Sequence, residues 1–164
     1  MSKTSPEPAA SVLELTLTRV FDAPRELVFR MWSDGEHMRR WSAPTGFTIP
    51  EGESDFRPGG AWRCLMVAPD GGEHRAGGVY REIVVPERLV MTHGWTDGEG
   101  RRGPETVLTV SFEDLGGKTR LTLHQGVFSC EPERDGHLGG WTESLAKLAT
   151  WLQDVLRQQH SAQQ

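Results

Sequence analysis

The feature that most constrains the fold is an apolar stripe near the end of the chain. Its members recur at spacings of 3, 4, 3, 4 and 3 residues, and they are Leu138, Trp141, Leu145, Leu148, Leu152 and Val155. This spacing places them on one face of an α-helix that is buried over about five turns. The chain shows no other long helix with which this stripe could pair. We therefore expect the helix to lie against the concave face of a β-sheet.

The sequence before this helix is typical of a sheet with two helices inserted near its start. Residues 13–20 alternate apolar and polar side chains, the pattern of a strand with one buried face. A short helix should follow over residues 24–33, with Pro24 at its first helical position, and a second should run through Met38 and Trp41. Between residues 47 and 127, turn sequences rich in Gly and Pro separate about five or six further strands. This order predicts an α+β fold in which a curved antiparallel sheet wraps around the long C-terminal helix.

Alternation within the strands predicts which side chains share a face. The expected sets are Trp62, Cys64 and Met66; Leu89, Met91, His93 and Trp95; Leu108, Val110 and Phe112; and Leu121 with Leu123. The strand over residues 88–95 carries more sulfur, imidazole and indole than an aliphatic core would use, so we expect it to form a cavity wall. The predicted ligand-binding residues are Trp62, Met66, Met91, His93, Trp95, Phe112, Trp141 and Leu145.

His93 is the main candidate for chemistry in this cavity. A neutral imidazole at this position could exchange a hydrogen bond with a ligand or act as a base near neutral pH. The alternative is a partly buried histidine that a neighbouring residue satisfies. His124 points to the opposite face by alternation, so we expect it at the surface. Arg81 and Glu82 are consecutive, so one of them would face inward unless a bulge intervenes; side chains of this length near a sheet rim usually stay solvated.

The tryptophans and glycines carry further expectations. Among the six tryptophans, two or three should border the cavity, with Trp62, Trp95 and Trp141 favoured, and an indole there could offer its N–H to a bound ring. The glycine pairs at 59–60, 71–72 and 77–78 lack the context of a phosphate-binding loop, so we expect turns or bulges. The pair at 139–140 lies near the expected start of the long helix. It either permits that start or leaves room at the cavity mouth.

Composition excludes several classes of function. The net charge of −5, without a local basic run, argues against a nucleic-acid partner, and no apolar window is long enough for a membrane span. Cys64 and Cys130 lack metal-ligand spacing, which indicates free thiols in a reducing compartment and hence a soluble, cytoplasmic protein. No motif for a metal, a cofactor or nucleophilic catalysis is present. We expect flexible tails at 1–11 and 159–164 around one domain at 12–158.

The sequence resembles the SRPBCC or START-like superfamily, and within it the bacterial branch similar to the Hsp90-ATPase-activator homology domain. The matching segments are Arg19 to Pro24, Val28-Phe29, Trp32, Trp41, Pro44, Arg57 to Gly60, Trp62, Met66, Asp70-Gly71, Gly78 to Tyr80, Glu82-Ile83, Pro86 to Val90, Gly117 to Leu121, His137, Gly140-Trp141 and Leu145. The resemblance covers about residues 13–156. It implies a helix-grip fold, and because members of this superfamily differ in activity, it implies no single function.

Three functions stay open at this point. The first is binding of a small hydrophobic or aromatic molecule in an apolar cavity, with His93 and tryptophan N–H groups orienting it. The second is a cyclase or hydrolase that acts on a polyketide-like substrate, with His93 moving a proton. The third, which the resemblance suggests, is regulation of a chaperone ATPase. Exposed strand edges could also pair in a homodimer.

Overall fold

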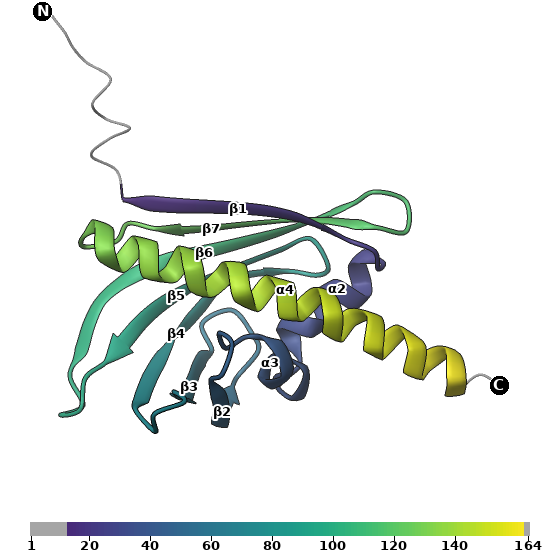
Figure 1. Ribbon diagram of the computed structural model, residues 1–164. Helices are drawn as coiled ribbons and strands as arrows, with labels where there is room; N and C mark the ends of the chain where they lie inside the picture. The colour runs from purple at the N-terminus through teal and green to yellow at the C-terminus, as the bar shows by residue number, and fades with distance from the viewer. Residues whose placement is uncertain (1–12, 163–164) are drawn as a thin grey trace, which may run out of the picture.

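The computed structural model describes residues 13–162, which form one curved antiparallel sheet and three helices (Figure 1). In chain order the elements are β1 (Glu14–Phe21), α2 (Arg25–Ser33), α3 (Gly35–Trp41), β2 (Thr48–Ser54), β3 (Ala61–Val67), β4 (Glu73–Val84), β5 (Arg88–Thr96), β6 (Arg102–Asp114), β7 (Thr119–Gly126) and α4 (Glu131–Ala162). The predicted α+β class and helix-grip architecture are confirmed, and six strands fall between residues 47 and 127.

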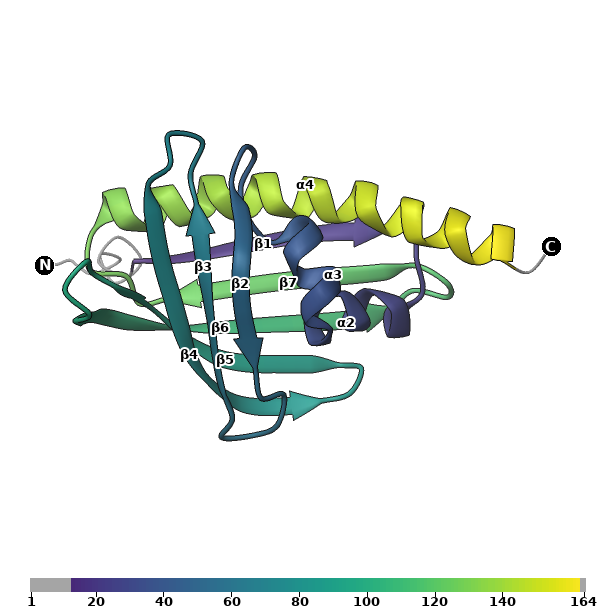
Figure 2. The same ribbon diagram turned by 90° about the horizontal axis from the view of Figure 1, so that it is seen from below.

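The sheet order explains its shape. The strands lie in the order β1-β7-β6-β5-β4-β3-β2, so β2 to β7 form a meander and β1 adds to β7. Every pair is antiparallel. The sheet bends around α4, which crosses its concave side, while α2 and α3 lie beside the middle of that helix (Figures 1 and 2). All three helices therefore lie on the concave side of the sheet.

The predicted helix stripe divides into two parts. Leu145, Leu148, Leu152 and Val155 are buried in the core, whereas the earlier members of the stripe are only partly buried. The core part packs with α2 and with the inner faces of β1, β5, β6 and β7. The first half of α4 thus lies over a region of the sheet that side chains do not fill completely.

The helix boundaries differ from the sequence-based prediction. Pro24 precedes α2 as its N-cap, with an extended ψ of 152°, and its carbonyl accepts hydrogen bonds from the N–H groups of Leu27 and Val28. Helix α4 begins at Glu131, because acidic residues and Pro132 suit a first turn whose N–H groups have no helical partner. The glycine pair at 139–140 therefore lies inside the helix.

The end of α4 also lies further along the chain than expected. No Gly or Pro occurs after residue 140, so the helix continues to Ala162, and residues 159–162 of the predicted tail are helical. The remainder of that tail and the predicted tail at 1–11 lie outside the described residues. Within residues 13–162, no helix is long and apolar enough to cross a membrane.

The surface positions follow the alternation of the strands. His124 lies on the outer face of β7, where Nε2 is 2.6 Å from Oε1 of Glu14 on β1. The pairing of β4 with β5 shifts register between Tyr80 and Glu82, which is the bulge that lets both Arg81 and Glu82 stay exposed. Glu82 forms an ion pair with Arg88. Neither charge enters the concave side.

Candidate functional site

A cavity of about 420 Å³ lies between the concave face of the sheet and the first half of α4. Its walls include six of the eight predicted ligand-binding residues: Trp62, Met66, Met91, His93, Trp95 and Trp141. The strand residues share the inner face of β3 and β5 because side chains on a strand alternate between its two faces. The structure thus brings six of the predicted residues, from two strands and one helix, to a common wall.

Phe112 and Leu145 are corrections to that prediction, because neither lines the cavity. Phe112 is 2% exposed and packs edge-on against the rings of Phe29 and Trp32, at centroid distances of 5.2 and 6.4 Å. Leu145 belongs to the buried part of the α4 stripe. Both residues lie on the predicted faces. Helix α2, which is inserted between β1 and β2, covers Phe112, and the packing of the core encloses Leu145. Alternation predicts the face and not what covers it.

Small residues on α4 leave the space that the cavity occupies. Gly136, Gly140 and Ser144 line it, at the four-residue spacing of one helix face. A Cβ atom at Gly140 would lie 3.5 Å from Cγ of Pro44, across the gap to the loop after α3. Gly139 does not line the cavity. Gly140 therefore fits the prediction of room at the cavity mouth, and the prediction of a permissive helix start is wrong.

His93 lies at the centre of an aromatic wall. Its side chain is 8% exposed, and its ring lies 5.6 Å from Trp62, 5.1 Å from Trp95 and 5.3 Å from His137, measured between ring centroids. Burial, followed by the charges of His137 and Arg102, lowers the pKa of His93 to about 3. The imidazole is therefore neutral at physiological pH. A base this weak is poorly suited to proton transfer near pH 7, which argues against that part of the enzyme hypothesis.

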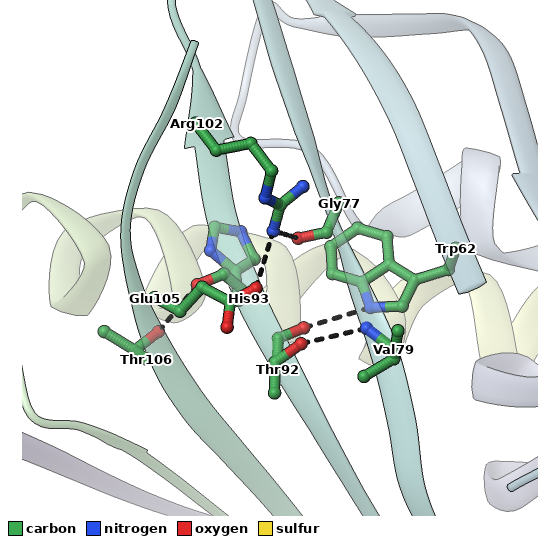
Figure 3. Close-up of polar contacts among 8 residues, drawn as sticks. All are labelled: Trp62, Gly77, Val79, Thr92, His93, Arg102, Glu105 and Thr106. Carbon is green, nitrogen blue, oxygen red and sulfur yellow. Dashed lines mark hydrogen bonds and ion pairs between the residues drawn. The ribbon is translucent and has the colours of Figure 1, made fainter. Parts of the chain in front are cut away.

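Arg102 supports this part of the sheet from the outer face. Its Nη2 donates to the carbonyl of Gly77 at 3.0 Å and to Oε2 of Glu105 at 2.8 Å (Figure 3). A Cβ atom at Gly94 would lie 2.9 Å from the same Nη2, so the guanidinium lies against bare backbone. The charge is thus held behind the cavity wall and paired with a carboxylate, while the cavity side stays apolar.

The backbone ladder between β4 and β5 opens beside His93. The N–H of Val79 donates to Oγ1 of Thr92 at 2.9 Å, and the indole of Trp62 donates to the carbonyl of Thr92 at 3.1 Å (Figure 3). A Cβ atom at Gly78 would lie 1.9 Å from that carbonyl oxygen, so only glycine fits. The glycine pair at 77–78 therefore lies within β4, where the described pairing with β5 is interrupted after Gly77.

His137 lines the cavity, although the strand pattern did not predict it as a site residue. Its Nε2 accepts a hydrogen bond from Nε1 of Trp95 at 3.0 Å, and burial lowers its pKa. The ring therefore carries its proton on Nδ1 when neutral. The signal that could have identified it is its position four residues before Trp141, one turn earlier on the same helix face.

The three favoured tryptophans present ring faces and not donors to the cavity. Trp62 donates to Thr92, Trp95 to His137, and Trp141 to Oε1 of Gln125 at 2.8 Å. The expectation that these N–H groups orient a ligand is therefore wrong, because each is already paired within the protein. Their contribution to the cavity is apolar area.

A buried polar chain holds Trp141 in place. Gln125 accepts from Trp141 and donates through Nε2 to Oγ1 of Thr106 at 2.9 Å, and Thr106 donates to the carbonyl of His93 at 3.3 Å. Gln125 is fully buried, and its amide oxygen and nitrogen both have partners. The helix wall and the strand wall of the cavity are thereby connected through hydrogen bonds.

The remaining polar groups on the wall are mostly uncharged. Burial raises the pKa of the Cys64 thiol to about 11, so it stays protonated, and the hydroxyl of Tyr80 lies 2.8 Å from that of Ser54. Glu133 is the charged residue of the wall, and its carboxylate accepts from the N–H of Ser129. Residues 13–162 contain no group of three or more side chains that could hold a metal ion, and the absence of a cofactor stays a prediction.

Comparison with known proteins assigns this arrangement to a family. Residues 22–153 match the family model described as Activator of Hsp90 ATPase homolog 1-like protein. The chain is similar to the crystal structure of the AHSA1 protein from Silicibacter pomeroyi, with 32% identity and a TM-score of 0.79 over 85% of this chain and 96% of that one. No curated protein matches it.

Two further solved structures agree with this assignment. A protein from Chromobacterium violaceum shares 30% identity, with a TM-score of 0.71 over 84% of this chain and 96% of that one. A protein from Arthrobacter aurescens shares 25% identity, with a TM-score of 0.76 over 87% of each chain. With the family model covering most of the sequence, the chain belongs to the family of Activator of Hsp90 ATPase homolog 1-like proteins, within the SRPBCC superfamily.

Proposed function

We propose that this protein binds a small hydrophobic or aromatic molecule in the cavity between the sheet and α4. The observation that carries the proposal is the cavity itself, with a volume of about 420 Å³ and walls of indole, thioether and imidazole side chains. Pockets of this size and lining usually bury most of the surface of a small ligand. Because the polar groups of the favoured tryptophans are paired within the protein, an apolar ligand would enter without breaking their hydrogen bonds.

His93 is the polar group best placed to orient such a ligand. Its ring lies among Trp62, Trp95 and His137, and no other side chain of the described residues forms a hydrogen bond with it. The pKa of about 3 keeps the ring neutral, so it offers a lone pair without a charge to desolvate. The proposed ligand-binding residues are therefore Trp62, Met66, Met91, His93, Trp95 and Trp141.

The first test is native mass spectrometry of the purified protein, followed by denaturing extraction. A bound mass that is released on denaturation supports the proposal and identifies the chemical class. If the purified protein carries no bound molecule, a panel of uncharged aromatic compounds is added to it instead. Binding is then measured by quenching of tryptophan fluorescence. Failure of every compound at millimolar concentration would contradict the proposal.

Two glycines of α4 provide a matched pair of variants. Gly136 lines the cavity and Gly139 does not, and at both positions an added Cβ would meet no atom within 4 Å. We expect Gly136→Phe to reduce ligand affinity by about tenfold or more, because the ring takes up cavity space. Gly139→Phe should leave affinity within about twofold, since the same change then points away from the ligand. Equal effects of the two variants would place the binding site elsewhere.

The other hypotheses stay predictions. Regulation of a chaperone ATPase would be tested by adding the purified protein to a chaperone and measuring the rate at which the chaperone hydrolyses ATP.

The two cysteines of the described chain are free thiols, which supports a reducing compartment such as the cytoplasm. Homodimer formation is tested by light scattering at several protein concentrations.

A further inference from the structure

Trp32 on α2 borders the cavity and carries a buried polar atom without a hydrogen-bond partner. The side chain is 2% exposed and lines the cavity, and its indole nitrogen is buried without a hydrogen-bond partner. The five other tryptophans of the chain all donate their N–H to an oxygen or nitrogen of the protein. A buried donor without an acceptor is rare in native proteins, and it costs free energy for as long as it stays unpaired.

The described contacts of the Trp32 ring are with other aromatic rings. The ring stacks on Trp141 at 5.7 Å and meets Trp41 edge-on at 4.7 Å, measured between ring centroids. Phe112 lies behind it at 6.4 Å. The N–H groups of Trp41 and Trp141 are already donated to the carbonyl of Met31 and to Gln125. No described residue forms a hydrogen bond with the indole N–H of Trp32, so an acceptor for it can come from a molecule that enters the cavity.

We propose that the ligand of this cavity is an uncharged aromatic molecule with a carbonyl-type hydrogen-bond acceptor, and that the indole N–H of Trp32 donates to this acceptor. The inference rests on the proposed ligand-binding function and specifies the ligand. The aromatic walls favour a flat ring system, and the shortage of charged wall groups favours a neutral polar group over an ionised one. Met38, Met66 and Met91 also line the cavity, and flexible thioether side chains let such a wall adjust around an acceptor.

The test compares two probes that differ only in the acceptor. 2-Acetylnaphthalene carries a C=O group, and 2-isopropenylnaphthalene carries C=CH₂ in its place with nearly the same shape. Each is titrated into ¹⁵N-labelled protein, and the six indole N–H signals report both affinity and hydrogen bonding. We expect the ketone to bind about tenfold more tightly than the hydrocarbon and to shift the Trp32 signal downfield, whereas the hydrocarbon should not produce this shift.

Two variants isolate the N–H group. Trp32→Phe keeps an aromatic ring and removes the donor, so the preference for the ketone should disappear while the hydrocarbon still binds. Trp151→Phe is the matched control, because the indole of Trp151 donates to Nδ1 of His37 and does not line the cavity. This variant should keep the full preference. If Trp32→Phe does not fold, the Trp32 signal of the wild-type protein, assigned from contacts to neighbouring rings, decides alone.

The outcomes separate this inference from the proposed function. Equal binding of both probes to the wild-type protein, or a ketone preference that survives in Trp32→Phe, overturns the inference and leaves a cavity that binds aromatic molecules. A Trp32 signal that the ketone does not shift also overturns it, and would mean that the faces of neighbouring rings suffice as partners. If neither probe binds, the proposed function itself fails for aromatic ligands of this size.

Discussion

At the residue scale, the cavity is defined by side chains whose polar atoms are already paired. Trp95 and His137 satisfy each other across 42 residues of sequence, and Gln125 pairs with both Trp141 and Thr106. His93 lies between them as a neutral ring. The indole N–H of Trp32 is an exception, because it is buried without a partner. With the ring of His93 it would supply directional contacts with a ligand.

The lowered pKa of His93 predicts how stability depends on pH. The folded state keeps this ring neutral down to about pH 3, whereas the unfolded chain binds a proton below about pH 6.5. Stability is therefore unaffected by His93 above pH 6.5 and falls as the pH decreases from 6.5 toward 3, by about 1.4 kcal/mol per pH unit. Urea unfolding at several pH values between 4.5 and 7.5 measures this slope.

The variant His93→Gln removes this titration. Its stability should fall less steeply between pH 5.5 and 4.5, with a slope smaller than that of the wild-type protein by about 1 kcal/mol per pH unit. Some slope should remain, because burial also lowers the pKa of His137 and acts in the same direction. Identical slopes for variant and wild type would show that His93 is protonated in the folded protein.

At the element scale, α4 and β4 each serve two purposes along their length. The second half of α4 buries Leu148 and Leu152 in the core, and the first half presents Gly136 and Gly140 to the cavity. In strand β4 the backbone of Gly78 lies against the carbonyl of Thr92, where the pairing with β5 is interrupted, and the same strand contributes Tyr80 to the core. Glycines inside a helix or a strand, which are unfavourable there, thus occur in α4 and β4 at or beside the cavity.

The contact at Gly78 predicts a large loss of stability on substitution. In Gly78→Ala the added methyl would lie 1.9 Å from the carbonyl oxygen of Thr92, so the backbone of β4 or β5 has to shift. We expect a loss of about 3 kcal/mol in the free energy of unfolding, measured by urea titration. Gly98→Ala, at a position where the methyl meets nothing within 4 Å, should change it by about 0.5 kcal/mol or less. Equal losses would mean that the contact between Gly78 and Thr92 can adapt to the methyl group.

At the scale of the whole molecule, one core joins the three helices and five of the seven strands. Buried residues from β1, α2, α3, β4 to β7 and α4 form a single cluster, and the cavity lies at its edge. The sheet has two edge strands, β1 and β2. Pro50, Glu51 and Glu53 on β2 disfavour pairing with another chain, so β1 is the edge more available for a homodimer.

A single core predicts cooperative unfolding. Far-ultraviolet circular dichroism and tryptophan fluorescence should report the same urea midpoint, because the sheet and α4 share that core. Leu148→Ala should lower the free energy of unfolding by about 2–5 kcal/mol without separating the two transitions, since Leu148 is fully buried. Leu115→Ala, in the exposed turn between β6 and β7, serves as the control and should have little effect. Two separated transitions in the wild-type protein would contradict a single cooperative unit.

Local periodicity was sufficient to predict the fold and much of the cavity wall. The stripe from Leu138 to Val155 and the alternation around His93 depend only on which face of an element a residue occupies, and this is a property of neighbouring positions. Trp62, Met91 and Trp95 could be predicted for the same reason.

The tertiary structure alone decided how these faces are used. Helix α2 places the ring of Phe29 against Phe112, which takes Phe112 out of the cavity, and a helix that begins at Glu131 brings His137 to Trp95. The pKa of His93 and the unpaired N–H of Trp32 likewise depend on what surrounds each group in space. Burial and hydrogen-bond partners are set by contacts between residues far apart in the chain, and no local pattern records those contacts.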